Sequence, residues 1–88
     1  MASEPVLIVW SEEAASGFKA LSYQPREEVL RRIAFIETNP MMYQVEERGR
    51  WAGLRRFYAL GVVVFYVYWR ETQSVYIEAV VPARGGQR

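Results

Sequence analysis

The sequence contains no cysteine and no histidine, and all ten of its acidic residues are glutamates. Without cysteine there is no disulfide framework, no thiolate metal site and no thiolate nucleophile. Without histidine the chain lacks the commonest general base and the commonest metal ligand. We therefore expect no metal and no cofactor, and any chemistry has to use Arg, Lys, Glu, Tyr or Ser side chains.

Long hydrophobic runs and low-complexity tracts are also missing. The apolar stretch from Val6 to Trp10 has no basic flank before it and is too short for a signal-peptide core or a membrane span. Of the 88 residues, 51% are hydrophobic, which is enough for one core but not for two domains. We expect a single cytoplasmic domain over residues 1–88, without a membrane partner, in which residues 84–88 form a flexible tail.

Charge is distributed unevenly along the chain, although the net charge is only +1. Residues 1–47 hold four basic and eight acidic side chains, whereas residues 48–88 hold seven basic and two acidic ones. The stretch from Arg48 to Arg70 carries five arginines and no acid. A one-sided group of cations can bind phosphates even when the total charge is near zero. The C-terminal half is therefore predicted to bind an anion.

Hydrophobic periodicity predicts a strand and two helices in the N-terminal half. Val6 to Trp10 is short and β-branched, which favours a strand, and Ser11 can cap the helix that follows. A second helix is expected to begin with Pro25 at its first position and to end at Asn39-Pro40, because proline disfavours helical geometry in the residue before it. The apolar stripes are Ala14, Phe18 and Leu21 on the first helix, and Val29, Leu30, Ile33 and Ile36 on the second.

The C-terminal half predicts three strands in an antiparallel meander, over about Leu54 to Leu60, Val62 to Arg70 and Ser74 to Val81. Gly61 and the polar Glu71-Thr72-Gln73 supply the two turns. The expected fold class is α+β, with an N-terminal strand, a helical hairpin and then the meander, the helices packing on one face of a single sheet.

Alternation along the strands predicts which faces are buried. In the last strand Val75, Ile77, Ala79 and Val81 share one face and are expected to meet the helices. The middle strand is apolar on both faces, which is typical of a central strand. Since two helices can cover only one face of the sheet, the other face is expected to expose Phe, Val or Trp side chains to a binding partner.

Arg55 and Arg56 are adjacent on a strand, so their side chains point to opposite faces. Guanidinium groups can bind phosphate in a bidentate manner, but an arginine pair can equally serve to keep a sheet rim soluble, and both interpretations stay open. Arg48, Arg50 and Arg84 could converge on the same region. Trp51 lies in an irregular connection among these arginines and is the best candidate for stacking on an unpaired base. Tyrosines 58, 66, 68 and 76 are more typical of packing.

Paired glutamates offer only one further candidate. Glu12-Glu13 and Glu27-Glu28 are explained by the preference of helix N-termini for carboxylates. Glu46-Glu47 lies beside the basic stretch and is a candidate general base.

Several sequence features occur together in one order along nearly the whole chain. They are Trp10-Ser11-Glu12-Glu13-Ala14, Asn39-Pro40, Gly53-Leu54-Arg55-Arg56 with Gly61, and a last strand that runs into Arg84. In this order and spacing they resemble the RelE/ParE toxin superfamily. Its members are cytoplasmic toxins of bacterial type II toxin–antitoxin modules, each blocked by an antitoxin that wraps around it. The resemblance implies that a cognate antitoxin covers the apolar sheet face.

The superfamily includes ribosome-dependent mRNA endonucleases and gyrase inhibitors, so the resemblance leaves both targets open, as well as an inactive binding protein. For an RNA target we expect Arg48, Arg50, Trp51 and Arg55 to bind RNA. Arg56 and Arg84 are expected to stabilise the phosphate without a metal while a 2′-hydroxyl attacks it. The chain departs from the nucleases at Val63, where they commonly carry an arginine, and it has no aromatic residue after Tyr76.

Overall fold

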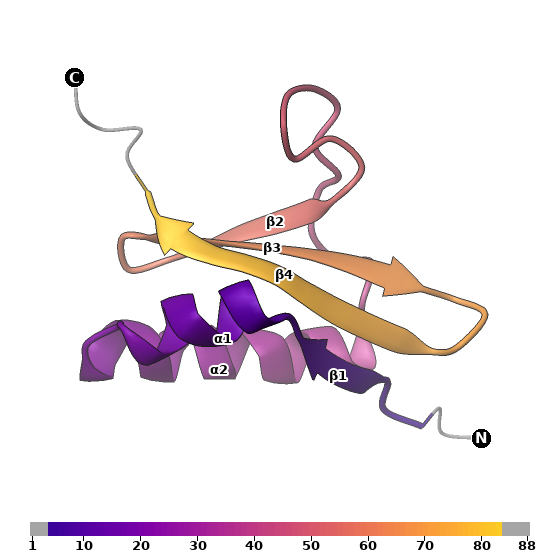
Figure 1. Cartoon of the computed structure of the whole chain (residues 1–88). Helices are drawn as coiled ribbons and strands as arrows, with labels where there is room; N and C mark the ends of the chain where they lie inside the picture. Colours follow the sequence, from indigo (N-terminus) through magenta and orange to yellow (C-terminus); the bar gives the residue numbers. More distant parts are fainter. Residues whose placement is uncertain (1–3, 84–88) are drawn as a thin grey trace.

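A computed structural model describes residues 4–83 as one sheet with two helices beneath it (Figure 1). Both helices lie on the same face of the sheet, and the strand order is β1-β4-β3-β2. The predicted α+β class is confirmed. Neither helix in this part of the chain is long and apolar enough to cross a membrane. The elements are β1 (Leu7–Trp10), α1 (Glu12–Lys19), α2 (Tyr23–Thr38), β2 (Arg55–Ala59), β3 (Val62–Trp69) and β4 (Ser74–Pro82).

Strands β2, β3 and β4 form the predicted antiparallel meander. Strand β1 joins the sheet at the far side of β4 and runs parallel to it, with Leu7 beside Ser74 and Trp10 beside Ile77. The first and last strands in the sequence are therefore neighbours, and β3 and β4 are the two central strands. This arrangement leaves β2 at one edge of the sheet.

The helix ends follow local capping rules, with one correction. The Oγ of Ser11 accepts a hydrogen bond from the N–H of Ala14 at 2.9 Å, as predicted for a capping serine. Helix α2 ends at Thr38, just before Asn39-Pro40, but it begins at Tyr23 and not at Pro25. Pro25 is tolerated within the first turn because the N–H groups there have no partner inside the helix.

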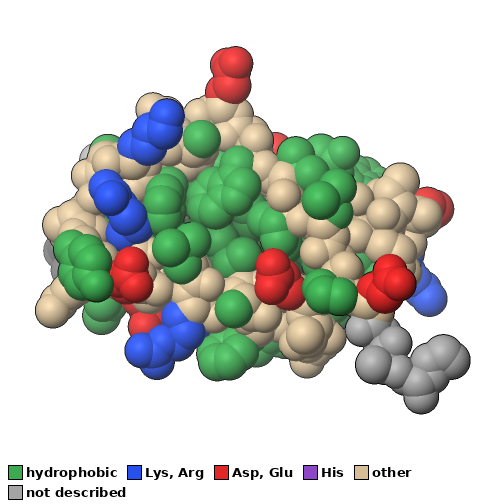
Figure 2. Space-filling model, turned by 90° about the horizontal axis from the view of Figure 1, so that it is seen from below, with side chains coloured by type: hydrophobic (Ala, Val, Ile, Leu, Met, Phe, Trp, Pro, Cys, Tyr) green, Lys and Arg blue, Asp and Glu red, His purple; other side chains and the backbone are tan. Residues whose placement is uncertain are grey.

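The main core lies between the helices and the sheet. Its largest fully buried side chains are Tyr66, Ile36, Ile77, Val29, Val64 and Val75. Leu30 was expected in the same stripe but is 43% exposed. Seen from the helix side, the molecule shows hydrophobic side chains across much of its surface, interspersed with charged ones (Figure 2).

A β-bulge in β4 changes the face of the sheet to which its later side chains point. Phe65 pairs with Ala79 and Tyr66 pairs with Ile77, so Glu78 is an extra residue on β4. Val75 and Ile77 join the main core as predicted, whereas Ala79 and Val81 belong to the cluster on the other face, and the prediction for these two is wrong. The bulge is fixed by Ser11, whose Oγ donates to the carbonyl of Glu78 at 3.0 Å.

The face of the sheet away from the helices is partly covered by the chain itself. Val63 and Phe65 are only 8% and 6% exposed, and the ring of Trp51 stacks on Phe65. The expectation that this face exposes Phe and Val side chains is therefore wrong for Val63 and Phe65. Farther along, Trp69 and Tyr76 are 49% and 39% exposed, so an apolar area remains uncovered near the β3–β4 turn.

Candidate nucleic-acid interface

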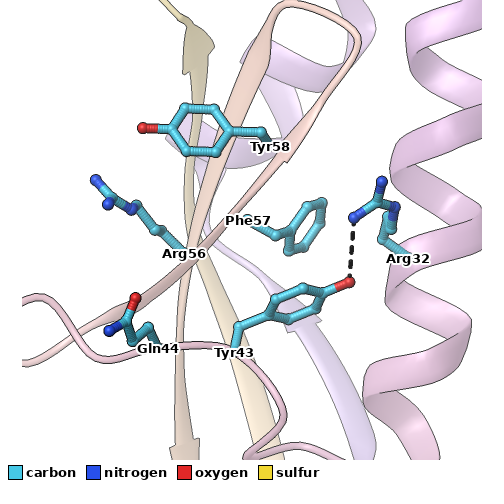
Figure 3. A pocket seen from close by; sticks show the side chains of 6 residues that line it. All are labelled: Arg32, Tyr43, Gln44, Arg56, Phe57 and Tyr58. Atoms are coloured by element: carbon cyan, nitrogen blue, oxygen red, sulfur yellow. Dashed lines mark hydrogen bonds between the residues drawn. The ribbon is translucent and has the colours of Figure 1, made fainter.

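A shallow cleft of about 390 Å³ runs along the outer edge of β2 (Figure 3). The cleft exists because residues 43–46 run beside only the first part of this edge strand. Val45 forms an isolated bridge with Arg55, and the N–H of Arg56 donates to the carbonyl of Gln44 at 3.3 Å. The lining side chains are Arg32, Tyr43, Gln44, Arg56, Phe57 and Tyr58.

The helix-side wall of the cleft is a hydrogen-bonded group of side chains. Arg32 on α2 donates from Nε to the Glu28 carboxylate at 2.8 Å and from Nη1 to the Tyr43 hydroxyl at 3.3 Å. The hydrogen bond from Arg32 lowers the pKa of Glu28, and the same bond raises the pKa of Arg32. Tyr43 packs against Phe57 with ring centroids 5.2 Å apart. This guanidinium is therefore already paired.

The other wall is formed by Arg56 and Tyr58, which lie two residues apart on β2 and so point to the same side of the strand (Figure 3). The guanidinium carbon of Arg56 lies 5.3 Å from the centre of the Tyr58 ring. Nε of Arg56 also pairs with a carboxylate oxygen of Glu46 at 2.9 Å. Arg56, a predicted catalytic residue, is thus at the cleft with its charge balanced by Glu46.

Arg55 points to the opposite side and fastens the connection between α2 and β2. Its Nη1 donates to the carbonyl oxygens of Tyr43 at 2.7 Å and Met41 at 3.3 Å. The hydroxyl of Tyr66 donates to the carbonyl of Pro40 at 2.9 Å, and burial raises the pKa of Tyr66 to about 12. These three bonds hold residues 40–43 against the sheet. The contact of Arg55 with RNA stays a prediction.

The other predicted RNA-binding residues lie in the connection before β2. The ring centroids of Trp51 and Phe65 are 4.3 Å apart with planes at 12°, and the Arg50 guanidinium lies 4.8 Å from the Trp51 ring centre. Trp51 therefore already has aromatic and cationic neighbours. Arg48 is exposed and makes no ion pair among residues 4–83. Arg84 lies outside the described residues.

Sequence reasoning found Arg56 but missed the residues that complete the cleft. Tyr58 could have been found, because a period of two places it on the same face as Arg56. Tyr43, Gln44 and Arg32 carry no such signal, since they come from an irregular segment and from the charged side of a helix. Val63 pairs with Val81 in the apolar cluster on the face away from the helices.

Comparisons with known proteins bear on the fold and not on the side chains of the site. No protein-family model matches the chain, and no curated protein matches it. Among solved structures, a chain of the intact E. coli RelBE toxin–antitoxin complex aligns with a TM-score of 0.77 and 15% identity, over 89% of this chain and 96% of that chain. The chain has the fold of the RelE toxins. The resemblance seen in the sequence is thus confirmed at the level of the fold.

Two further structures share the RelE fold with this chain. The isolated E. coli RelE toxin aligns with a TM-score of 0.77 and 18% identity, over 89% of this chain and 84% of that chain. A chain of the archaeal RelE–RelB complex from Pyrococcus horikoshii aligns with a TM-score of 0.68 and 14% identity, over 96% of this chain and 99% of that chain. At these identities the RelE fold is common to all three, while the side chains of the site have to be judged on this chain alone.

Proposed function

We propose that the chain is the toxin of a type II toxin–antitoxin module and inhibits translation by binding mRNA at the ribosome. The observation that carries the RNA target is the pairing of Arg56 with Tyr58 on the exposed edge of β2. One supplies a guanidinium for a phosphate and the other a ring for a base. The RelE fold supports the assignment as a toxin, and the cytoplasm is the compartment in which mRNA and ribosomes are found.

A cognate antitoxin is the proposed protein partner. Similar solved structures include complexes of RelE-type toxins with their antitoxins. Exposed Trp69 and Tyr76 form an apolar area on the sheet, which a bound protein segment can cover. We place the antitoxin contact here and not over Phe65, because Trp51 already buries that ring.

If the bound RNA is cleaved, the proposed step needs no metal. Glu46 takes the proton of the 2′-hydroxyl while the 2′-oxygen attacks the adjacent phosphorus, the bond to the 5′-oxygen of the next nucleotide breaks, and that 5′-oxygen takes up a proton from solvent. Arg56 and Arg84 are the proposed partners of the extra negative charge on the phosphate, and Glu46 is the carboxylate nearest to Arg56 for proton transfer. Arg48, Arg50, Trp51 and Arg55 are the proposed contacts that position the RNA backbone.

Translation of a defined mRNA with purified protein tests the proposal. We expect reduced product, with ribosome positions or cut ends mapped by primer extension. The variant Arg56→Gln should restore most of the product. Arg31→Gln is the matched control, because Arg31 is an exposed arginine on α2 outside the cleft. Undiminished translation at high protein concentration would remove the proposed function.

One observation favours gyrase inhibition as a second candidate. Val63 occupies the position at which nucleases of the superfamily commonly carry an arginine, and it is buried in an apolar cluster with Phe65 and Ala79. A gyrase inhibitor needs a complementary surface but no phosphate chemistry. This candidate predicts blocked DNA supercoiling in vitro together with normal translation, and the two assays on one protein preparation separate it from the first.

A further inference from the structure

We infer that the cleft along β2 is a subsite for one nucleotide unit of single-stranded RNA, and that Glu46 occupies the place of its phosphate until RNA binds. The inference rests on the proposed RNA target and deepens it, because it names the residues that bind the base and the contact that opposes binding. The cleft volume of about 390 Å³ lies within the range of small-ligand sites.

Tyr58 is the proposed platform for the base. Its side chain is on the outer wall of the cleft (Figure 3), and the residue is 53% exposed, so a flat ring can approach it. Base–aromatic stacking does not require a particular base. Gln44 lies on the same side of β2 as Arg56 and Tyr58 (Figure 3) and makes no side-chain hydrogen bond among residues 4–83. Its amide offers one acceptor and two donors to the edge of the base.

The free edge of β2 adds backbone groups to this platform. The outward N–H of Arg56 is used by the carbonyl of Gln44. In an antiparallel ladder outward-facing groups recur at every second residue, so Tyr58 presents the next outward N–H and C=O. Residues 43–46 do not reach this part of the edge. A base stacked on the Tyr58 ring therefore lies beside a backbone donor and a backbone acceptor.

Arg56 is the proposed phosphate ligand. Its Nε lies 2.9 Å from Glu46, and a guanidinium carries further N–H donors that a phosphate can engage in a bidentate manner. The Arg56 and Glu46 side chains are 36% and 23% exposed, and ion pairs that solvent reaches contribute little to stability. A phosphate can thus displace Glu46, while the carboxylate repels phosphates that arrive without a stacking base.

Calorimetric titration of the full chain tests the subsite, with adenosine 3′-monophosphate, adenosine and inorganic phosphate as separate ligands. We expect the nucleotide to bind more tightly than either of its parts. Tyr58→Leu should weaken nucleotide binding about tenfold, which corresponds to roughly one stacked base. Glu46→Gln should strengthen binding of both nucleotide and phosphate by about fivefold, because the competing carboxylate is lost. Tyr58→Leu should leave phosphate binding unchanged.

Two matched controls keep the result specific. Glu47→Gln removes the same charge one residue away, where no ion pair is found among residues 4–83, and Tyr23→Leu removes an exposed ring on α2, away from the cleft. Equal effects of Glu46→Gln and Glu47→Gln would show general electrostatics and overturn the inference. No binding of nucleotide by either the wild type or Glu46→Gln would overturn it as well.

Binding of a tetra-adenylate RNA to the wild type and to the cleft variants tests the subsite and the proposed RNA target separately. If the RNA binds and none of the cleft variants changes its affinity, the RNA target stands and the subsite is wrong. If the mononucleotide binds with the expected variant pattern but the RNA does not bind, the cleft is a site for free nucleotides, and RNA as its ligand is removed together with the RNA target. Thermal unfolding of each variant confirms that the exposed substitutions leave the fold intact.

Discussion

The indole of Trp51 lies flat on the ring of Phe65, with centroids 4.3 Å apart and planes at 12°. This contact attaches the irregular segment before β2 to the sheet face that the helices leave open. Leu54 and Val81 pack around the same cluster. The stack therefore provides the second, smaller core of the protein.

Replacing Trp51 with alanine should lower the free energy of unfolding by about 2–3 kcal/mol, somewhat less than for a fully buried aromatic residue. Trp51→Phe keeps a ring on Phe65 and should lose about 1 kcal/mol. Denaturant titration followed by circular dichroism measures both. If Trp51→Ala unfolds at the wild-type midpoint, the indole does not stabilise this face.

Gly17→Ala should destabilise the protein, against the usual trend for helices. In a helix interior alanine is normally better than glycine by about 0.5–1 kcal/mol. A Cβ at Gly17, however, would overlap the backbone carbonyl of Val80 on β4. We expect a loss of about 1–3 kcal/mol, since the helix has to move away from the strand. Ser16→Ala on the exposed side is the control and should be neutral or slightly stabilising in the same thermal melts.

Tyr66→Phe tests the bond that anchors the segment after α2. Loss of the hydrogen bond to the Pro40 carbonyl should reduce stability by about 1–2 kcal/mol at neutral pH.

The same residue predicts a pH dependence. The pKa of Tyr66 is about 12 in the folded protein, above the value of about 10 in an unfolded chain. The folded state therefore holds the Tyr66 proton more tightly than the unfolded chain does. The contribution of protonated Tyr66 to the free energy of unfolding is complete below pH 10 and is lost as pH rises towards 12. Between pH 9 and pH 12 the free energy of unfolding should fall more steeply for the wild type than for Tyr66→Phe, as measured by denaturant titration at each pH. Tyr23→Phe, at an exposed tyrosine, should behave as the wild type does.

Ser11→Ala should lower stability by about 1–2 kcal/mol, because the Ser11 hydroxyl makes two bonds. It accepts from the N–H of Ala14 and donates to the carbonyl of Glu78. Ser11→Thr keeps the hydroxyl and should retain most of the stability. If Ser11→Ala melts at the same temperature as Ser11→Thr and the wild type, the two hydrogen bonds of Ser11 do not stabilise the fold.

The strands and helices could be predicted because each has a local signal. Gly61 marks the turn between β2 and β3, and Asn39-Pro40 marks the end of α2. The pairing of β1 with β4 has no such signal, since two short apolar strands far apart in sequence can pair in several ways. The bulge at Glu78 could not be predicted either. Val80 and Val81 are both apolar, so either residue could point towards the helices.

The candidate site was only partly predictable for the same reason. Arg56 and Tyr58 follow from the period of a strand, but the pairing of Arg56 with Glu46 joins residues across an irregular segment. The sequence places Arg55 and Arg56 on opposite faces of the strand but does not show which of them reaches a cleft. The structure separates them, because one faces the Tyr43 and Met41 carbonyls and the other faces the cleft.

Strand β4 lies between β1 and β3, although it comes last in the sequence. During synthesis β1 and α1 cannot make their contacts with β4 until residues 74–82 have been made. These N-terminal elements should therefore acquire their native packing only after β4 has emerged from the ribosome. Fragments that end before Ser74 are expected to be degraded and not to accumulate.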